Sequence, residues 1–372
     1  MSTPGSQGRS IQHLSPISDP DSVEDIDPEF ADIFIHLREA DDARARAGDI
    51  RGLWNTAENN IAHLSSRFVT EPDVDFSGAW APQLQNLWHL YYVAGRHCVE
   101  STVASLVIQI LETSSRGMLS RSRLASSGEV EREYAPLYVR TGDDMIQQYL
   151  WQDLPMLVPN MTSYWMRDFA RMSRSQRVRL SHFLASLAAA STAQWAYGLC
   201  GIALLVLRDT LESDRRLVRA IVEPGGEDSE NNGRSVDMLT IADLLLAVDA
   251  WLMRAGKRIV QLCEVGDGTA DGSLSALIPE QICQTGPLAA EAGVQSVTGG
   301  FSSQRWLFWL RRLDEIGGEL AGYENENVSP FVQRVRTEKQ VARQVARNMI
   351  YAASQSDSNI TQELVRMGRL PL

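Results

Sequence analysis

The segment from Phe183 to Leu207 constrains the fold more than any other, because it contains no charged residue. An uncharged stretch of this length can cross a bilayer, or it can form a helix buried on all sides. Its first half is mostly alanine and serine, which are only weakly apolar on insertion scales. Its other polar residues include Thr192 and Gln194. We therefore expect a central buried helix and no transmembrane span.

Helical periodicity extends over most of the remaining chain. Apolar residues three and four positions apart predict helices at about 30–47, 53–68, 82–98, 162–191, 193–215, 236–263, 302–317 and 330–353. The sequence shows no convincing alternating strand pair and no repeat of fixed period. No linker divides the helices into two self-sufficient sets. The sequence therefore predicts an all-α protein, a single irregular multi-helix bundle.

Two tails are expected to flank this bundle. Residues 1–28 are rich in Ser, Pro and Gly, and the run from Asp19 to Asp32 carries seven carboxylates and no basic residue. Such a composition is typical of a disordered acidic tail. The helical domain is expected to span 29–355, and a C-terminal tail is expected at 356–372.

Longer connections are predicted between some of the helices. The stretches 113–130, 223–235 and 264–300 are rich in Ser, Gly or acidic residues. The first of them contains a basophilic kinase pattern from Arg123 to Ser126, so the sequence leaves phosphorylation of Ser126 open.

The charge and the N-terminus limit the classes of function. With 47 acidic and 35 basic residues the formal charge is −12, which argues against sequence-independent binding of nucleic acid. The polar N-terminus lacks the apolar core of a secretory signal, and the four cysteines form no C-x-x-C pair. We therefore expect reduced cysteines and a cytoplasmic protein, with the nucleus as the other compartment left open.

The sequence contains no motif that names a reaction. His89 and His97 lie eight positions apart and cannot easily share an ion, and there is no H-E-x-x-H, no phosphate-binding G-x-x-x-x-G-K and no G-x-S-x-G. A lysine-based mechanism has few candidates, since the chain has only two lysines, Lys257 and Lys339. We expect no metal and no cofactor.

One set of charged residues is a candidate polar site. Arg208 and Glu212 are four positions apart and face the same side of a helix. Together with further residues they can build a small-molecule pocket with an acid and a base poised by burial, or a structural network that fixes the helix register. The structural alternative is favoured. The full set is Asp153, Arg208, Asp209, Glu212 and Arg305.

Aromatic residues are predicted to line the core or a pocket. In "WQDLP" Trp151 can bury its ring, Pro155 can end the preceding helix, and Asp153 can accept backbone N–H bonds or an arginine. We predict a packing wedge between helices. The aromatic candidates are Trp151, Trp165, Trp306 and Trp309.

The last long helix carries a basic stripe, Arg336, Lys339, Arg343 and Arg347, at spacings of three and four. Such a stripe is most often only solvated, but it can bind an acidic partner, an anionic membrane or the acidic run of the same chain. Among these partners we favour pairing with the acidic run, because it supplies the complementary charge in cis.

Several segments together resemble a fungal domain-of-unknown-function family, the one numbered 3632. They are "WQDLPML" at 151–157, "YW" at 164–165, "YGLCGIALLVLRDTLE" at 197–212, "GPL" at 286–288 and "GGFSSQRWLFWLRRL" at 299–313. The resemblance extends over about 85–325. It implies a soluble, all-helical fungal protein with no known activity, and some members lie near specialised-metabolism genes.

The leading functional hypothesis is an intracellular, non-catalytic helical interaction or regulatory protein, with another protein as its partner. The alternative is a helical enzyme or ligand carrier that acts as an accessory protein in fungal specialised-metabolite biosynthesis. The alternative predicts an apolar cavity on which Asp153, Arg208, Glu212 and Arg305 converge. The sequence identifies neither the partner nor the ligand.

Overall fold

The computed structural model describes residues 28–70, 80–124, 130–134, 136–141, 144–219, 229–268, 278–319, 330–356 and 358–370. The described chain is a multi-helix bundle, which confirms the predicted all-α class. The predicted acidic tail lies outside the described residues except for Pro28, where the first helix begins. Ser126 also lies outside them.

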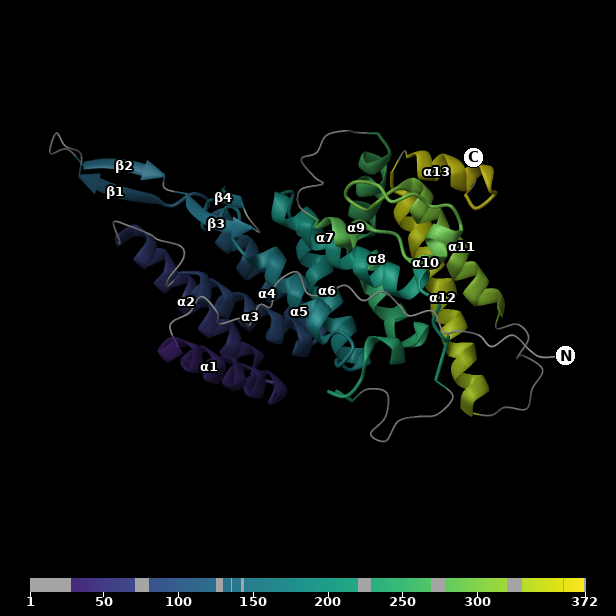
Figure 1. The fold of residues 1–372 in the computed structure, drawn as a ribbon, viewed down its shortest axis with the longest axis horizontal. Coiled ribbons are helices and arrows are strands. Elements are labelled where there is room, and N and C mark those ends of the chain that lie inside the picture. The colour runs from purple at the N-terminus through teal and green to yellow at the C-terminus, as the bar shows by residue number, and fades with distance from the viewer. Residues whose placement is uncertain are drawn as a thin grey trace.

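The long helices are arranged in chain order from one end of the molecule to the other (Figure 1). Helices α1 and α2 lie at the end that also carries the strands, α6 to α8 lie in the middle, and α11 to α13 lie at the opposite end. The longer helices are α1 (Pro28–Arg46), α2 (Ile50–Thr70), α3 (Ala81–His97), α4 (Glu100–Ser115), α5 (Leu157–Asp168), α6 (Arg174–Ala190), α7 (Gln194–Leu207), α8 (Ile241–Gly268), α11 (Ser303–Glu319), α12 (Pro330–Ser354) and α13 (Asn359–Arg366).

The uncharged segment forms the centre of the bundle, as the sequence predicts. It is divided between the end of α6 and the whole of α7, with a break at residues 191–193. Nearly every residue of α7 is buried, including the apolar run from Ile202 to Leu207. None of the helices within the described ranges is long and apolar enough to span a membrane.

The predicted helix at 162–191 is wrong in one respect, because it is two helices. Helix α5 ends at Asp168 and α6 begins at Arg174. Ser173 is the N-cap of α6: its Oγ accepts a hydrogen bond from Gln176 N at 3.1 Å, and its own N–H donates to Gln176 Oε1 at 2.8 Å. This reciprocal capping box starts a new helix and thereby sets the directions of the arginine side chains in its first turns.

Two short hairpins follow α4, the first beginning within the predicted loop at 113–130 and the second lying after it, so the expectation of no strand pair is wrong here. Strand β1 (Ser120–Leu124) pairs antiparallel with β2 (Val130–Tyr134), and β3 (Leu137–Thr141) pairs antiparallel with β4 (Asp144–Gln148). The sequences "SRSRL" and "VEREY" are largely polar, so they carry little of the apolar alternation that marks a strand. Arginines oppose glutamates in this first hairpin, at Arg121↔Glu133 and Arg123↔Glu131.

The predicted C-terminal tail is also wrong, because α13 lies within it. Ser358 caps this helix by accepting a hydrogen bond from Thr361 N at 3.0 Å. Ile360 and Leu364 are four positions apart and fully buried. After the end of α8, the described part of the predicted connection at 264–300, residues 278–300, holds only the short helices α9 (Glu280–Cys283) and α10 (Pro287–Glu291).

Candidate functional site

Two of the sequence-predicted polar residues, Glu212 and Arg305, meet in the core. Helix α7 continues into a single π-helical turn, η2 (Arg208–Glu212), which brings Glu212 opposite the first turn of α11. The Arg305 guanidinium binds the carboxylate through two hydrogen bonds, Nε to Oε1 at 2.5 Å and Nη2 to Oε2 at 2.9 Å. Both side chains are essentially inaccessible to solvent.

All hydrogen-bonding capacity of this Glu212–Arg305 clamp is used within the protein. The remaining Arg305 N–H groups donate to the carbonyl oxygens of Cys283, Gln284 and Gly300. The Glu212 oxygens also accept from Trp309 Nε1 at 2.6 Å and from Gly286 N at 2.6 Å. A clamp with no spare donor or acceptor suits the structural alternative: it ties the connection before α11 to the end of α7.

The other members of the predicted polar set do not join this clamp. Arg208 Nη1 donates to the carbonyl oxygen of Gln281 at 3.3 Å, and Arg208 Nη2 lies 3.8 Å from Asp209 Oδ1. Asp153 accepts a hydrogen bond from Tyr149 N at 2.7 Å, which closes its own turn. The described contacts therefore do not bring Asp153 to the cavity expected from the ligand-carrier hypothesis.

The four candidate tryptophans are all buried. Trp151 packs between helices and donates its indole N–H to Ser65 Oγ of α2 at 2.9 Å. Trp165 stacks on Phe169 with ring centroids 6.1 Å apart, and Trp306 contacts Trp309 edge to face at 6.4 Å. These rings fill the core, and the 151–157 turn has the contacts of a packing wedge.

The predicted basic stripe on α12 is not one continuous exposed surface. Arg343 and Arg347 are exposed, but Lys339 is only 4% exposed and Arg336 is half-buried. Lys339 therefore belongs to the packed side of α12, and the stripe as a single partner-binding surface is wrong at this position. The sequence spacing places these residues on neighbouring turns but does not reveal which turn is covered.

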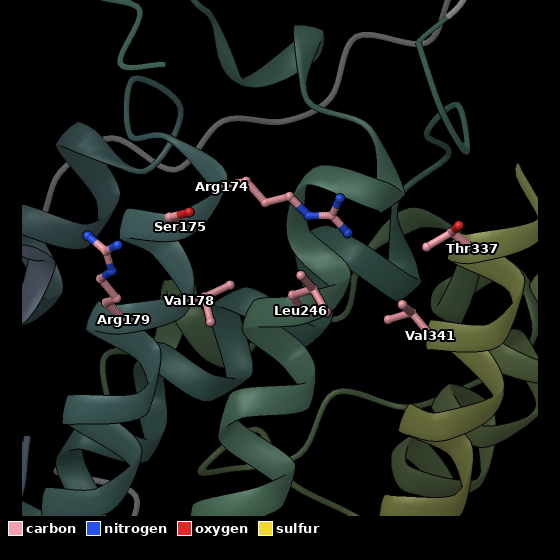
Figure 2. Close-up of a pocket in the computed structure, with 7 residues that line it drawn as sticks. All are labelled: Arg174, Ser175, Val178, Arg179, Leu246, Thr337 and Val341. Carbon is pink, nitrogen blue, oxygen red and sulfur yellow. The ribbon is translucent and has the colours of Figure 1, made fainter. Parts of the chain in front are cut away.

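A pocket that the sequence did not reveal opens between α6, α8 and α12. Its volume is about 520 Å³, in the range typical of small-molecule sites. Figure 2 shows that Arg174 reaches over Leu246 toward α12, while Arg179 lies at the opposite end. We call this the arginine pocket. It combines apolar side chains with polar and basic groups, and its lining consists of Arg174, Ser175, Val178, Arg179, Leu246, Thr337 and Val341.

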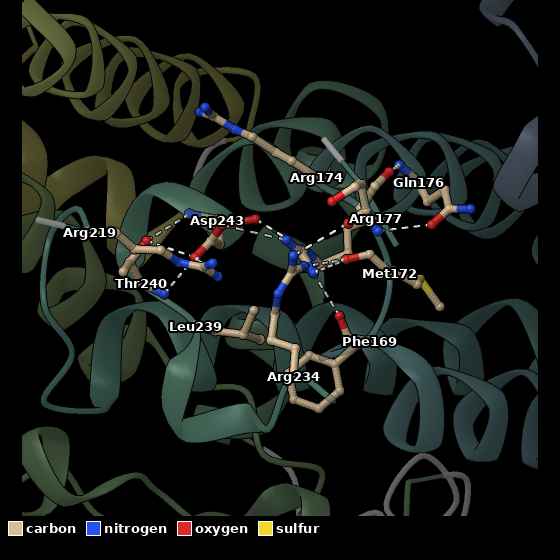
Figure 3. Close-up of polar contacts among 12 residues, drawn as sticks. Phe169, Met172, Arg174, Gln176, Arg177, Arg219, Arg234, Leu239, Thr240 and Asp243 are labelled. Atoms are coloured by element: carbon tan, nitrogen blue, oxygen red, sulfur yellow. Dashed lines mark hydrogen bonds and ion pairs between the residues drawn. The ribbon is translucent and has the colours of Figure 1, made fainter. Parts of the chain in front are cut away.

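Behind the arginine pocket, the fully buried Arg177 organises the start of α6. Its Nη1 donates to the carbonyl oxygens of Phe169 at 2.8 Å and Met172 at 2.6 Å, and its Nε donates to the Asp243 carbonyl oxygen at 3.1 Å (Figure 3). Arg234 Nη1 reaches the same Met172 oxygen at 3.0 Å. These bonds hold the α5–α6 turn against α8.

Asp243 is the principal carboxylate of this cluster. Its Oδ2 accepts hydrogen bonds from Thr240 N and Thr240 Oγ1, both at 2.8 Å, and from Arg219 Nη2 at 3.1 Å. Although burial acts to raise its pKa, the Thr240 hydrogen bonds and the charges of Arg177 and Arg219 hold the pKa of Asp243 below its usual value. Asp243 therefore stays ionised.

Positive charge is in excess around the pocket among the described residues. The groups that act most on Arg177 and on Glu338 of α12 are five arginines and two carboxylates: Arg174, Arg177, Arg219, Arg234, Arg334, Asp243 and Glu338. Burial lowers the pKa of Arg177 to about 10; Asp243 opposes this change and the neighbouring arginines add to it. The excess of arginines over carboxylates around the pocket, in a chain of charge −12, favours an anionic ligand.

The sequence does carry a signal for this site. Five arginines, Arg167, Arg171, Arg174, Arg177 and Arg179, fall within "RDFARMSRSQRVR". A run of this kind at the start of a helix indicates a basic patch. The predicted helix at 162–191 runs through the break before Arg174, so it does not reveal that Arg174, Arg177 and Arg179 lie in the first turns of a separate helix.

Comparison with known proteins gives a family and a relative. The family described as "Protein of unknown function (DUF3632)" matches residues 88–313. The "Oxopyrrolidines biosynthesis cluster protein G" of Penicillium oxalicum is 36% identical over 240 residues, which is 63% of this chain and 60% of that protein. No solved structure matches. The family match over residues 88–313 includes the Glu212–Arg305 clamp and the α6 and α8 walls of the arginine pocket. Because it extends over more than half of the sequence, the chain belongs to the DUF3632 family.

Proposed function

We propose that this chain is an accessory protein of fungal specialised-metabolite biosynthesis that binds a carboxylate-bearing small molecule in the arginine pocket. Its resemblance to the oxopyrrolidine-cluster protein supports the pathway class. The observation that carries the binding role is the pocket itself, in which Arg174 lies beside the apolar side chains of Val178, Leu246 and Val341. A cytoplasmic location is part of the proposal.

The chemistry of the lining sets the kind of ligand. Val178, Leu246 and Val341 offer apolar contact, while arginine is the side chain best suited to a carboxylate. The hydroxyls of Ser175 and Thr337 add neutral hydrogen-bonding groups. The proposed ligand is therefore an apolar molecule with one acid group. The protein would bind it reversibly, as a carrier or a sensor.

A thermal-shift series tests this proposal with decanoate and its neutral analogue decanamide. Decanoate at a hundred times its dissociation constant is expected to stabilise the folded protein by about 2.7 kcal/mol and to raise its melting temperature. Decanamide is expected to have a much smaller effect, because it lacks the charge that Arg174 recognises.

The variant Arg174→Ala is expected to lose the decanoate shift. The matched control is Arg343→Ala, which removes an exposed arginine of α12 outside the pocket and is expected to keep the shift. Equal shifts with the acid and the amide, or equal shifts in both variants, would contradict the proposed binding site.

An interaction or regulatory role is the second candidate, and one observation favours it. Helix α1 exposes Ile33, Ile35 and Leu37 at 53%, 44% and 45% of their surfaces, while Asp41 and Ala45 face the body of the protein. Exposed apolar side chains of this kind often mark a protein-binding surface.

If α1 binds a partner, Ile33→Asp with Leu37→Asp is expected to abolish co-purification of that partner from a fungal lysate. His36→Asp on the same helix is the control and is expected to retain it. Identical partner profiles for the two variants would remove α1 as the interaction surface.

A further inference from the structure

The arginine pocket already contains a carboxylate bound to Arg174, and this carboxylate belongs to the protein. Arg174 Nη2 donates to Glu338 Oε1 at 2.9 Å and to Oε2 at 3.0 Å. Glu338 is 1% exposed, whereas the Arg174 side chain is 21% exposed and lines the pocket. Glu338 thus binds the Arg174 guanidinium from the protein interior, and this is the same guanidinium that an incoming acid would bind from the pocket.

The single charge of Arg174 makes the two carboxylates compete, because it can balance only one of them. A carboxylate that binds an arginine through two parallel hydrogen bonds uses either Nε with Nη2 or Nη1 with Nη2. The Glu212–Arg305 clamp shows the first of these arrangements in this protein. Both arrangements use Nη2, which in Arg174 contacts both oxygens of Glu338, so a second carboxylate at this nitrogen would lie beside Glu338 and be repelled by it.

We infer that a ligand carboxylate replaces Glu338 on Arg174, and that Glu338 takes up one proton from solvent when it is displaced. The inference rests on the proposed function. No covalent bond changes: Arg174 exchanges one carboxylate for another, and the proton goes to a Glu338 oxygen. The ligand stays ionised, and the charge of the buried site is the same before and after binding.

The surroundings of Glu338 support this proton uptake. Burial already raises the pKa of Glu338 above its usual value, although Arg174 and Arg334 act to lower it, and Asp243 of α8 adds to the increase. Once Arg174 turns to the ligand, Glu338 keeps Arg334 and Asp243 as its charged neighbours and loses the donor that holds its charge. A buried carboxylate without such a donor favours its protonated form.

Two consequences separate displacement from simple addition of the ligand. Between the pKa of Glu338 when it is bound to Arg174 and its higher pKa when displaced, binding takes up a proton, so affinity rises as pH falls. The dissociation constant of decanoate is then expected to increase by up to about tenfold per pH unit in this window. Addition without displacement gives no such dependence.

The test is calorimetric titration of the full chain with decanoate in phosphate and in Tris buffer at the same pH. The two buffers differ in heat of ionisation, so the difference in binding heat measures the protons exchanged. We expect a net uptake approaching one proton for the wild type and none for Glu338→Gln. The variant is also expected to bind about tenfold more tightly, because its neutral amide competes less for Arg174.

The outcomes are distinct. If decanoate binds with no proton uptake and Glu338→Gln leaves the affinity unchanged, displacement is wrong while the proposed binding function stands. If the wild type shows no decanoate binding that depends on Arg174, both are wrong. Glu363→Gln, which removes a carboxylate paired with Arg366 on α13 outside the pocket, is the control and is expected to behave as wild type.

Discussion

Replacing Arg305 by methionine is expected to lower the free energy of unfolding by about 3–5 kcal/mol, the range for breaking a buried ion pair. Methionine fills much of the same volume but leaves the Glu212 charge buried with only Trp309 Nε1 and Gly286 N as donors. The carbonyl oxygens of Cys283, Gln284 and Gly300 also lose their donor. Urea unfolding followed by tryptophan fluorescence measures the change.

A second substitution separates the charge from the packing. Adding Glu212→Leu to Arg305→Met removes the uncompensated charge, so the double variant is expected to recover part of the lost stability. Arg366→Met is the surface control, because its ion pair with Glu363 is exposed, and its effect is expected within about 0.5 kcal/mol. If Arg305→Met matches this surface control, the clamp does not hold the fold together.

Replacing Gly300 by alanine is expected to be the other severe change. Gly300 has φ +77°, and a Cβ there would lie 2.3 Å from Leu204 Cδ2 and 3.0 Å from Cys283 Cα. The left-handed backbone costs a non-glycine residue about 1–2 kcal/mol. Overpacking adds about 1–3 kcal/mol, because the Leu204 side chain is fully buried and cannot move aside freely.

The adjacent glycine provides the matched control. Gly299 has a similar φ of +81°, but a Cβ there would meet no heavy atom within 4 Å. Gly299→Ala should therefore show only the backbone cost, measured by the same urea unfolding. Equal losses for the two variants would mean that the close approach of Gly300 to Leu204 and Cys283 is unimportant for stability.

Much of the helical architecture could be predicted because its apolar residues recur at helical spacing. Helices α2, α8 and α12 lie close to their expected positions, and the uncharged α7 is buried as expected. The first hairpin was not predicted because its strands lack apolar alternation. The break before α6 and the short α13 could have been found from Ser173 and Ser358, since each serine is an N-cap.

The clamp was partly predictable, whereas the sequence signals the arginine pocket only through the arginine run at 167–179 and does not reveal its shape. Glu212 and Arg305 are a carboxylate and an arginine inside apolar helices, and such residues must pair when they are buried. Asp153 is also a carboxylate in an apolar segment, but it accepts its hydrogen bond from Tyr149 N within the same turn. Residue spacing alone does not predict this local bond. The pocket joins α6, α8 and α12, and its shape depends on how these helices pack.

Burial of individual charged residues was the least predictable property. The sequence pattern grouped Lys339 with the basic stripe and assigned no function to the neighbouring Glu338. Both side chains are buried in the structure. Helical spacing defines which residues share a face, but the neighbouring helices decide how much of that face is covered. Arg174 and Glu338 lie on two helices far apart in the sequence, so no local sequence pattern predicts their ion pair.

A crystal structure of the protein with bound decanoate tests the central claim most directly. The account predicts the decanoate carboxylate on the Nη2 edge of Arg174, the alkyl chain against Val178, Leu246 and Val341, and Glu338 turned away from Arg174. Decanoate bound at a different surface, or an arginine pocket closed by the protein's own side chains at saturating ligand, would contradict the account.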